Sequence, residues 1–114
     1  MFRKRKKEAQ AELPRYQDFS VQTAFDRIIF EDLVTDEDAY IVELARELLD
    51  GSPLVINFEQ LGVDEANKVV AFLSGVIYAC DGQVEKINSR VFLFARNQEF
   101  KDGTLKKFVE EYQE

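Results

Sequence analysis

One amphipathic segment constrains the fold of this chain most strongly. A glycine, a proline and a short apolar run follow directly after it. Its apolar residues recur at the i, i+3, i+4, i+7 and i+8 spacing of a helix face: Ile41, Leu44, Ala45, Leu48 and Leu49. Gly51 and Pro53 end this helix, and Leu54–Phe58 is typical of a buried strand. The segment predicts a domain in which helices pack on a sheet.

The remaining patterns extend this unit in both directions. Ile28-Ile29-Phe30 predicts a strand, and Thr35-Asp36-Glu37-Asp38 predicts the helix start, with the Thr35 hydroxyl at the cap and acidic residues in the first turn. Further along, the expected elements are a helix from Asp64-Glu65 to about Cys80, a hairpin of Val84–Ile87 and Val91–Phe94, and a short amphipathic helix with Leu105, Phe108, Val109 and Tyr112. We therefore expect an α/β two-layer sandwich of the α+β type, in the order β-α-β-α-β-β-α, with the helices on one face of a small mixed sheet.

Charge divides the chain into a basic tail and an acidic body. Residues 1–20 carry six basic and three acidic side chains, a net +3, and residues 21–114 carry nine basic and nineteen acidic ones, a net −10, which together give the total of −7. The apolar density rises from Phe25, so we place a tail with a short linker at residues 1–24 and a globular domain at 25–114. An acidic body argues against nucleic acid as a partner.

The residue types needed for most catalysis are scarce. With no His and a single Cys80, the chain has neither a zinc ligand set nor a disulfide framework, so we expect a reducing compartment, no metal, no cofactor and no catalytic residue. Asp36, Glu37 and Asp38 fit a helix start better than a metal site. No apolar run follows the basic N-terminus as a signal-peptide core, and no segment approaches the ~18 apolar residues of a membrane span, so we expect an intracellular protein.

The second helix is apolar almost all round. Lys68, Phe72, Gly75 and Ala79 lie opposite its core face, and between Lys68 and Asp81 the only ionisable groups are the Cys80 thiol and the Tyr78 phenol. Because a helix that is apolar on both sides is covered on both sides, this face is a candidate docking site for a peptide or protein. The alternative is that the C-terminal helix or the N-terminal arm of the same chain covers it.

The strand around Val91-Phe92-Leu93-Phe94 is apolar on both faces of the sheet. Two helices cover only one face, so a second copy of the sheet is the simplest cover for the other, with these four residues at a homodimer interface. The alternative is a strand buried between the sheet and the terminal helix.

The N-terminus holds the only concentrated positive charge. Its candidate contacts with an anionic membrane are Phe2, Arg3, Lys4, Arg5, Lys6, Lys7 and Leu13, of which Phe2 and Leu13 fall on one narrow apolar stripe if the segment is helical. A solvated tail is the alternative.

A family resemblance rests on the second helix and the hairpin. The run Asp64-Glu65-Ala66-Asn67-Lys68-Val69-Val70-Ala71-Phe72-Leu73-Ser74-Gly75-Val76-Ile77-Tyr78-Ala79, followed by Gly82, Lys86-Ile87 and Phe92-Leu93, resembles the central signature of SepF, a bacterial cell-division protein family. The similarity covers about residues 27–97 and includes the preceding strand–helix–strand order.

The resemblance implies a non-enzymatic adaptor at the inner face of the cell membrane at the division site. Members of this family bind the C-terminal peptide of FtsZ with the globular domain, form dimers through their sheets, assemble further, and attach to membrane through an N-terminal helix. Carried over to this chain, Lys68 and Phe72, with Gly75 and Ala79 beside them, become the expected peptide site, with Lys68 suited to acidic groups and Phe72 to apolar ones.

Two other classes stay open. A phospho-switch module of the anti-sigma-factor-antagonist type also alternates short strands and helices, although its switch serine lies at a helix start and Ser74 falls inside the second helix. A small regulatory domain that binds a metabolite is the other class, and a thermal-shift screen with metabolites distinguishes it from an adaptor.

Overall fold

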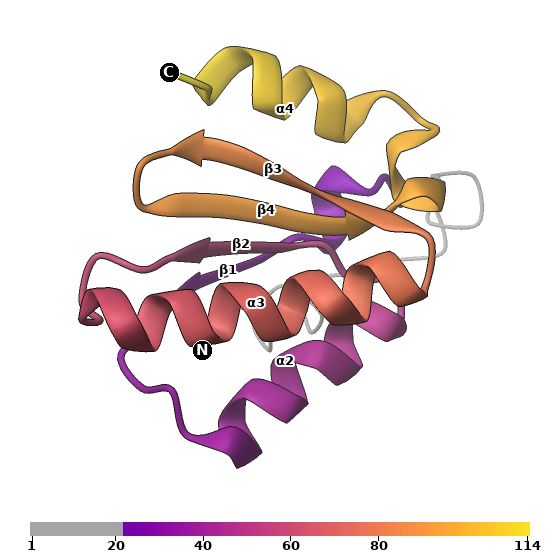
Figure 1. The fold of residues 1–114 in the computed structure, drawn as a ribbon. Helices are drawn as coiled ribbons and strands as arrows, with labels where there is room; N and C mark the ends of the chain where they lie inside the picture. The colour runs from indigo at the N-terminus through magenta and orange to yellow at the C-terminus, as the bar shows by residue number, and fades with distance from the viewer. Residues whose placement is uncertain (1–21) are drawn as a thin grey trace, which may run out of the picture.

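A computed structural model describes residues 22–114, which form a four-stranded mixed sheet with helices on both of its faces (Figure 1). The strands are β1 (Ile29–Asp32), β2 (Leu54–Asn57), β3 (Gly82–Asn88) and β4 (Val91–Arg96), arranged in the order β1-β2-β4-β3. β1 and β2 are parallel, and β4 runs antiparallel to both of its neighbours. The parallel pair needs a crossover connection, which the helix between these strands supplies.

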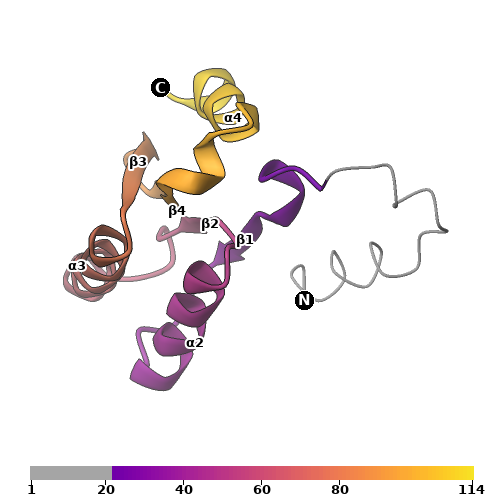
Figure 2. The same ribbon diagram turned by 90° about the vertical axis from the view of Figure 1, so that its right-hand side faces the viewer.

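The helices confirm the predicted α+β class and the order β-α-β-α-β-β-α, with one difference in placement. α2 (Asp38–Leu49) and α3 (Val63–Ala79) lie on one face of the sheet, as expected. α4 (Thr104–Tyr112) lies across the other face, together with two short 3-10 turns, η2 (Phe25–Arg27) and η3 (Asn97–Phe100) (Figures 1 and 2). The expectation that all helices cover one face is therefore wrong for α4.

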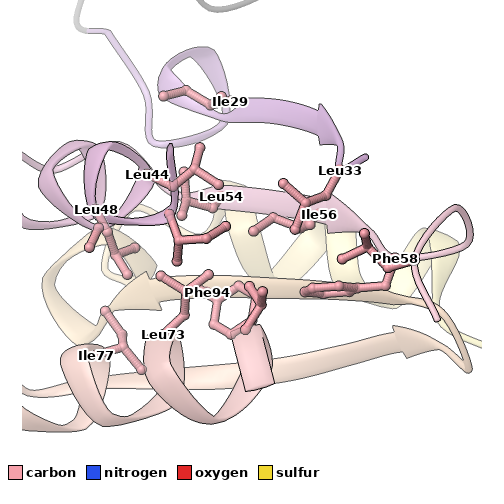
Figure 3. Close-up of a cluster of buried hydrophobic side chains, with 14 residues drawn as sticks. Ile29, Leu33, Leu44, Leu48, Leu54, Ile56, Phe58, Leu73, Ile77 and Phe94 are labelled. Atoms are coloured by element: carbon pink, nitrogen blue, oxygen red, sulfur yellow. The ribbon is translucent and has the colours of Figure 1, made fainter. Parts of the chain in front are cut away.

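The core under α2 and α3 is fully apolar (Figure 3). Leu44 and Leu48 of α2, Leu73 and Ile77 of α3, and Phe94 of β4 have no exposed surface. Gly82 begins β3, and a Cβ there would lie 2.5 Å from the backbone oxygen of Ala95 and would also collide with the side chain of Ile77 on α3. Only glycine fits at this position, because any side chain would be forced into the sheet.

A second, smaller core lies between the sheet and α4. Leu93 and Ala95 of β4 and Leu105 and Val109 of α4 belong to this cluster, which also includes Ala24, Ile28, Val55 and Ile87. Successive side chains of a strand point to opposite faces, so Phe94 faces α2 and α3 while Leu93 faces α4. The terminal helix of the same chain thus buries the second apolar face of β4. This arrangement is the alternative to a second copy that the sequence analysis left open.

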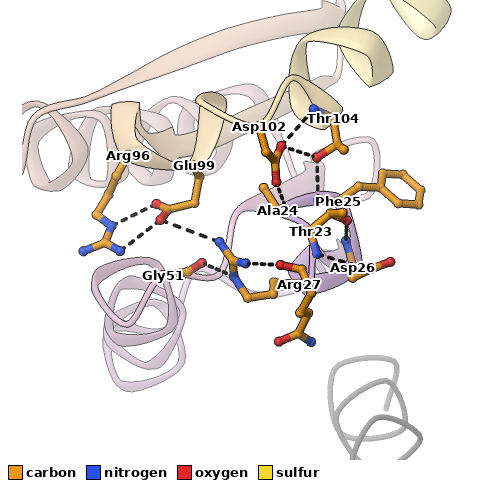
Figure 4. A network of polar contacts seen from close by, with 11 residues as sticks. Thr23, Ala24, Phe25, Asp26, Arg27, Gly51, Arg96, Glu99, Asp102 and Thr104 are labelled. Carbon is orange, nitrogen blue, oxygen red and sulfur yellow. Dashed lines mark hydrogen bonds and ion pairs between the residues drawn. The ribbon is translucent and has the colours of Figure 1, made fainter. Parts of the chain in front are cut away.

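Polar contacts join η2 to the start of α4 (Figure 4). The Asp102 carboxylate accepts hydrogen bonds from the backbone N–H groups of Ala24 and Thr104, each at 2.9 Å, and Phe25 N–H donates to Thr104 Oγ1 at 3.0 Å. These bonds favour the charged carboxylate and lower the pKa of Asp102 below its usual value, the bond from the Thr104 backbone having the largest effect.

A buried carboxylate lies close to this junction. Glu99 is 4% exposed and accepts two hydrogen bonds from the Arg96 guanidinium, at 2.9 and 3.0 Å. Arg27 of η2 lies 3.8 Å from the same carboxylate and also donates to the Gly51 carbonyl. Since a buried charge is tolerated only when it is paired, these contacts fix η2, η3 and the end of α2 relative to one another.

Candidate functional site

The surface between α2 and α3 holds an open, largely apolar groove of about 450 Å³. It is lined by Asp38, Ile41, Val42, Lys68, Val69 and Phe72. Phe72 is 43% exposed and Val42 38% exposed, so two apolar side chains of the groove lining remain accessible to solvent. A concave apolar surface of this size with a few polar groups at its edge has the usual properties of a binding site.

The loop before α3 fixes the position of this helix. Arg90, in the β3–β4 turn, donates through Nη2 to the carbonyl oxygens of Phe58 at 2.9 Å and Leu61 at 3.1 Å. These bonds hold the β2–α3 connection against the hairpin. Val69 and Leu73 then face the core, and Lys68 and Phe72 face outward beside α2.

Lys68 is not a free cation. Its ammonium nitrogen lies 3.3 Å from Asp36 Oδ2, 3.4 Å from Asp38 Oδ1 and 3.4 Å from the Asp36 carbonyl oxygen. Hydrogen bonding to Asp36 and then to Asp38 raises the pKa of the Lys68 ammonium. The sequence predicted Lys68 as a ready partner for acidic groups, but two carboxylates of this chain already hold it.

The start of α2 explains this pairing. The sequence placed Thr35 at the helix cap, but α2 begins at Asp38, and Thr35 Oγ1 instead accepts the Glu37 backbone N–H at 3.1 Å in a local turn. Asp36 therefore lies before the helix and reaches across to α3. The acidic residues Asp36, Glu37 and Asp38 thus do more than begin a helix, because Asp36 and Asp38 bind Lys68.

The four predicted peptide-site residues separate into two groups. Lys68 and Phe72 line the groove. Gly75 and Ala79 are exposed on α3 but do not line it, and Tyr78, 65% exposed, lies between them in sequence.

Sequence reasoning missed the α2 wall of the groove. Ile41 was assigned to the core only, and Val42 was not considered at all. Val42 falls outside the core stripe of Ile41, Leu44 and Leu48, and this irregularity was the available signal for an exposed apolar residue on α2.

The predicted dimer residues contribute to the two cores. Leu93 and Phe94 have no exposed surface, so neither offers a face to a second copy, because α4 covers one and α2 with α3 cover the other. Val91 and Phe92 are half-buried, and the Phe92 ring packs edge-on against Phe58 with 5.8 Å between ring centres. The homodimer stays a prediction, with Val91 and Phe92 as the accessible part of the expected interface.

The predicted membrane contacts, Phe2 to Lys7 and Leu13, lie outside the described residues. Within residues 22–114, no helix combines the length and apolarity needed to span a bilayer. The same part of the chain brings together no group of three metal-ligating side chains. Cys80 is half-buried, with its thiol 3.6 Å from the Ile77 carbonyl oxygen, and Ser74 is half-buried in the interior of α3.

The fold is a small mixed α+β domain with an open apolar groove between two of its helices. The family model described as "Cell division protein SepF" matches residues 36–98, which is more than half of the chain and includes both walls of the groove. The chain belongs to the SepF family of cell-division proteins.

Curated relatives agree with this assignment. The chain is 34% identical over 70 residues to cell division protein SepF of Natranaerobius thermophilus, covering 61% of this chain and 42% of that protein. It is 32% identical over 81 residues to cell division protein SepF of Carboxydothermus hydrogenoformans, covering 71% and 57%. The chain thus spans about half the length of the curated relatives that it matches.

A solved structure supports the fold. The SepF-like protein from Pyrococcus furiosus superimposes with a TM-score of 0.51 at 15% sequence identity, over 62% of this chain and 89% of that chain. At this identity the likeness concerns the fold alone. α4 lies beyond the segment matched by the family model.

Proposed function

We propose that this protein is a non-enzymatic division adaptor that binds the C-terminal peptide of FtsZ in the groove between α2 and α3. The observation that carries the proposal is the exposed Phe72 ring beside an apolar groove of about 450 Å³, within the segment that matches the family. Aromatic side chains at the centre of a concave surface are the usual anchors of peptide binding.

Tethering is the second part of the proposal. The tail up to Leu13 attaches the adaptor to an anionic membrane through its basic residues, so that FtsZ filaments bound to the domain are held or bundled at the inner face of the cell membrane during septum formation. The five consecutive basic residues Arg3 to Lys7 support this role, since each basic group next to an anionic leaflet contributes on the order of 1 kcal/mol. Self-association would add avidity to both contacts.

A fluorescence-anisotropy titration tests peptide binding. A labelled C-terminal peptide of FtsZ from the same organism, with a scrambled peptide as control, is titrated with the full chain. Saturable binding of the native peptide alone is expected. Phe72→Ala should weaken this binding by about tenfold or more, because truncating an aromatic anchor that the bound peptide covers costs about 2 kcal/mol.

Tyr78→Ala supplies the matched control. Tyr78 is a more exposed aromatic residue on the same helix and lies outside the groove lining, so its removal should leave the affinity unchanged. Circular dichroism should report equal helix content for both variants. Equal affinity of Phe72→Ala and the unmodified chain would overturn the site.

Sedimentation with liposomes tests the tether. The full chain should sediment with anionic vesicles and not with neutral ones, and the chain lacking residues 1–13 should stay in the supernatant with an unchanged oligomeric mass. Equal sedimentation of the shortened chain would place the membrane contact elsewhere.

A further inference from the structure

The polar end of the groove is acidic once Lys68 is counted together with its neighbours. Lys68 is the only basic residue of α3, and it is matched by two carboxylates, Asp36 and Asp38, within 3.4 Å. Asp64 stands one turn before Lys68 on α3, and Glu37 lies between the two aspartates in sequence. Lys68 and the two aspartates that it contacts therefore sum to one negative charge, and the acidic residues Glu37 and Asp64 lie close to them in sequence.

The rest of α2 does not change this balance. Its single basic residue, Arg46, lies two turns further along the helix and pairs with Glu43 at 3.4 Å. Away from Lys68 and Asp38 the lining of the groove is apolar on both walls, with Val42 on α2 and Phe72 on α3. The groove thus has apolar walls and an anionic end.

The accessibility of the two aspartates decides what this end can bind. The Asp38 side chain is 89% exposed and that of Asp36 35% exposed, so Asp38 offers most of its carboxylate surface to a second cation while it contacts Lys68. The Lys68 side chain is itself 56% exposed, but an incoming carboxylate that approaches it meets the repulsion of both aspartates. An incoming ammonium or guanidinium group meets attraction instead.

We propose that the groove selects an apolar peptide segment that carries a lysine or arginine beside its apolar residues, with the cation placed against Asp36 and Asp38. The inference rests on the proposed function, because it specifies the chemistry of the peptide that this site takes. It reverses the charge preference that the sequence suggested for Lys68. Phe72 and Val42 contact the apolar residues, and the carboxylate pair selects the charge.

Two charge-altered peptides and one double variant test this preference. Both peptides keep the apolar residues of the FtsZ C-terminal peptide, and their charged positions are all lysine in one and all glutamate in the other. The lysine peptide should bind the full chain about tenfold more tightly than the glutamate peptide, since each exposed charge contact changes affinity by about two- to fivefold. In the double variant Asp36→Asn/Asp38→Asn, the ratio of the affinities for the lysine and glutamate peptides should be severalfold smaller.

A second double variant controls for net charge. Glu110→Gln/Glu111→Gln also removes two negative charges, but from the exposed side of α4, across the sheet from the groove. This variant should prefer the lysine peptide as strongly as the unmodified chain does. An equal loss of preference in both double variants would show attraction to the whole acidic body and would overturn the role of Asp36 and Asp38.

The outcomes separate this inference from the proposed function. Tighter binding of the glutamate peptide, with the native peptide still bound, overturns the charge preference and leaves the adaptor function standing. Failure of all peptides, the native one included, overturns the adaptor function itself. Tighter binding of the lysine peptide after removal of residues 1–13 would show that the basic tail competes for the groove, which supports the preference for cations and leaves the separate peptide as an occupant.

Discussion

The packing of α4 on the second face of the sheet predicts a large loss of stability for Leu105→Ala. Leu105 has no exposed surface and lies in the cluster that includes Leu93 and Ala95 of β4. The substitution removes most of a fully buried side chain and leaves a cavity between helix and sheet. Such changes cost about 2–5 kcal/mol of the free energy of unfolding.

This cost is a large share of the stability of a domain of this size, which is typically about 5–15 kcal/mol. Because a loss of 1 kcal/mol lowers Tm by about 4–8 °C in small domains, a loss of about 2–5 kcal/mol should lower Tm by roughly 8–40 °C. Urea unfolding followed by circular dichroism measures the free energy directly, and the m-value should stay constant. Lys106→Ala, an exposed neighbour on the same helix, should change the free energy by less than about 0.5 kcal/mol.

A loss of less than about 0.5 kcal/mol in the free energy of unfolding of Leu105→Ala would refute the reasoning. It would mean that in solution α4 does not pack on the face of the sheet opposite α2 and α3. Should the alanine variant fail to fold, Leu105→Val keeps the test usable. The smaller truncation should cost about 0.5–1.5 kcal/mol.

Three further predictions concern single residues. Gly82→Ala should lower the free energy of unfolding by about 1–3 kcal/mol, because its Cβ would collide with Ile77 and the Ala95 carbonyl. Gly75→Ala should raise the free energy of unfolding by about 0.5–1 kcal/mol, because no atom lies within 4 Å of the new Cβ. Urea unfolding measures both changes, and two changes of the same sign would contradict this reasoning. The lowered pKa of Asp102 means that its carboxylate adds stability that is complete above the unfolded-state pKa of about 4 and is lost as the pH falls through the lower folded-state pKa. Asp102→Asn should therefore flatten the acid limb of a Tm-against-pH curve, and an unchanged limb would exclude this carboxylate as its source.

Local patterns were enough to predict most of the fold. The apolar spacing from Ile41 to Leu48 and the stop at Gly51 define α2 in the structure, where Gly51 has a φ of 102° that suits glycine. The expected hairpin is present, with both strands longer than predicted. These features depend on neighbours in sequence, so the sequence alone carries them.

Features that depend on distant neighbours were not predictable in the same way. The apolar stripe of α4 shows that this helix is covered, but not which surface covers it, and so the burial of Leu93 was first attributed to a second copy. The pairing of Lys68 with Asp36 spans 32 residues and follows from how α2 and α3 pack. Of the candidate site, Phe72 was found from its position on α3, and the α2 wall was not.

The attachment of Ala24 and Phe25 to the start of α4 has a mechanical consequence. The described chain begins on the α4 side of the sheet, and the groove lies on the α2 and α3 side (Figures 1 and 2). A pulling force between the N-terminal end and an occupant of the groove would cross the sheet from face to face rather than run along its strands. Under such a load, the bonds from Ala24 to Asp102 and from Phe25 to Thr104 would be among the first to bear the force.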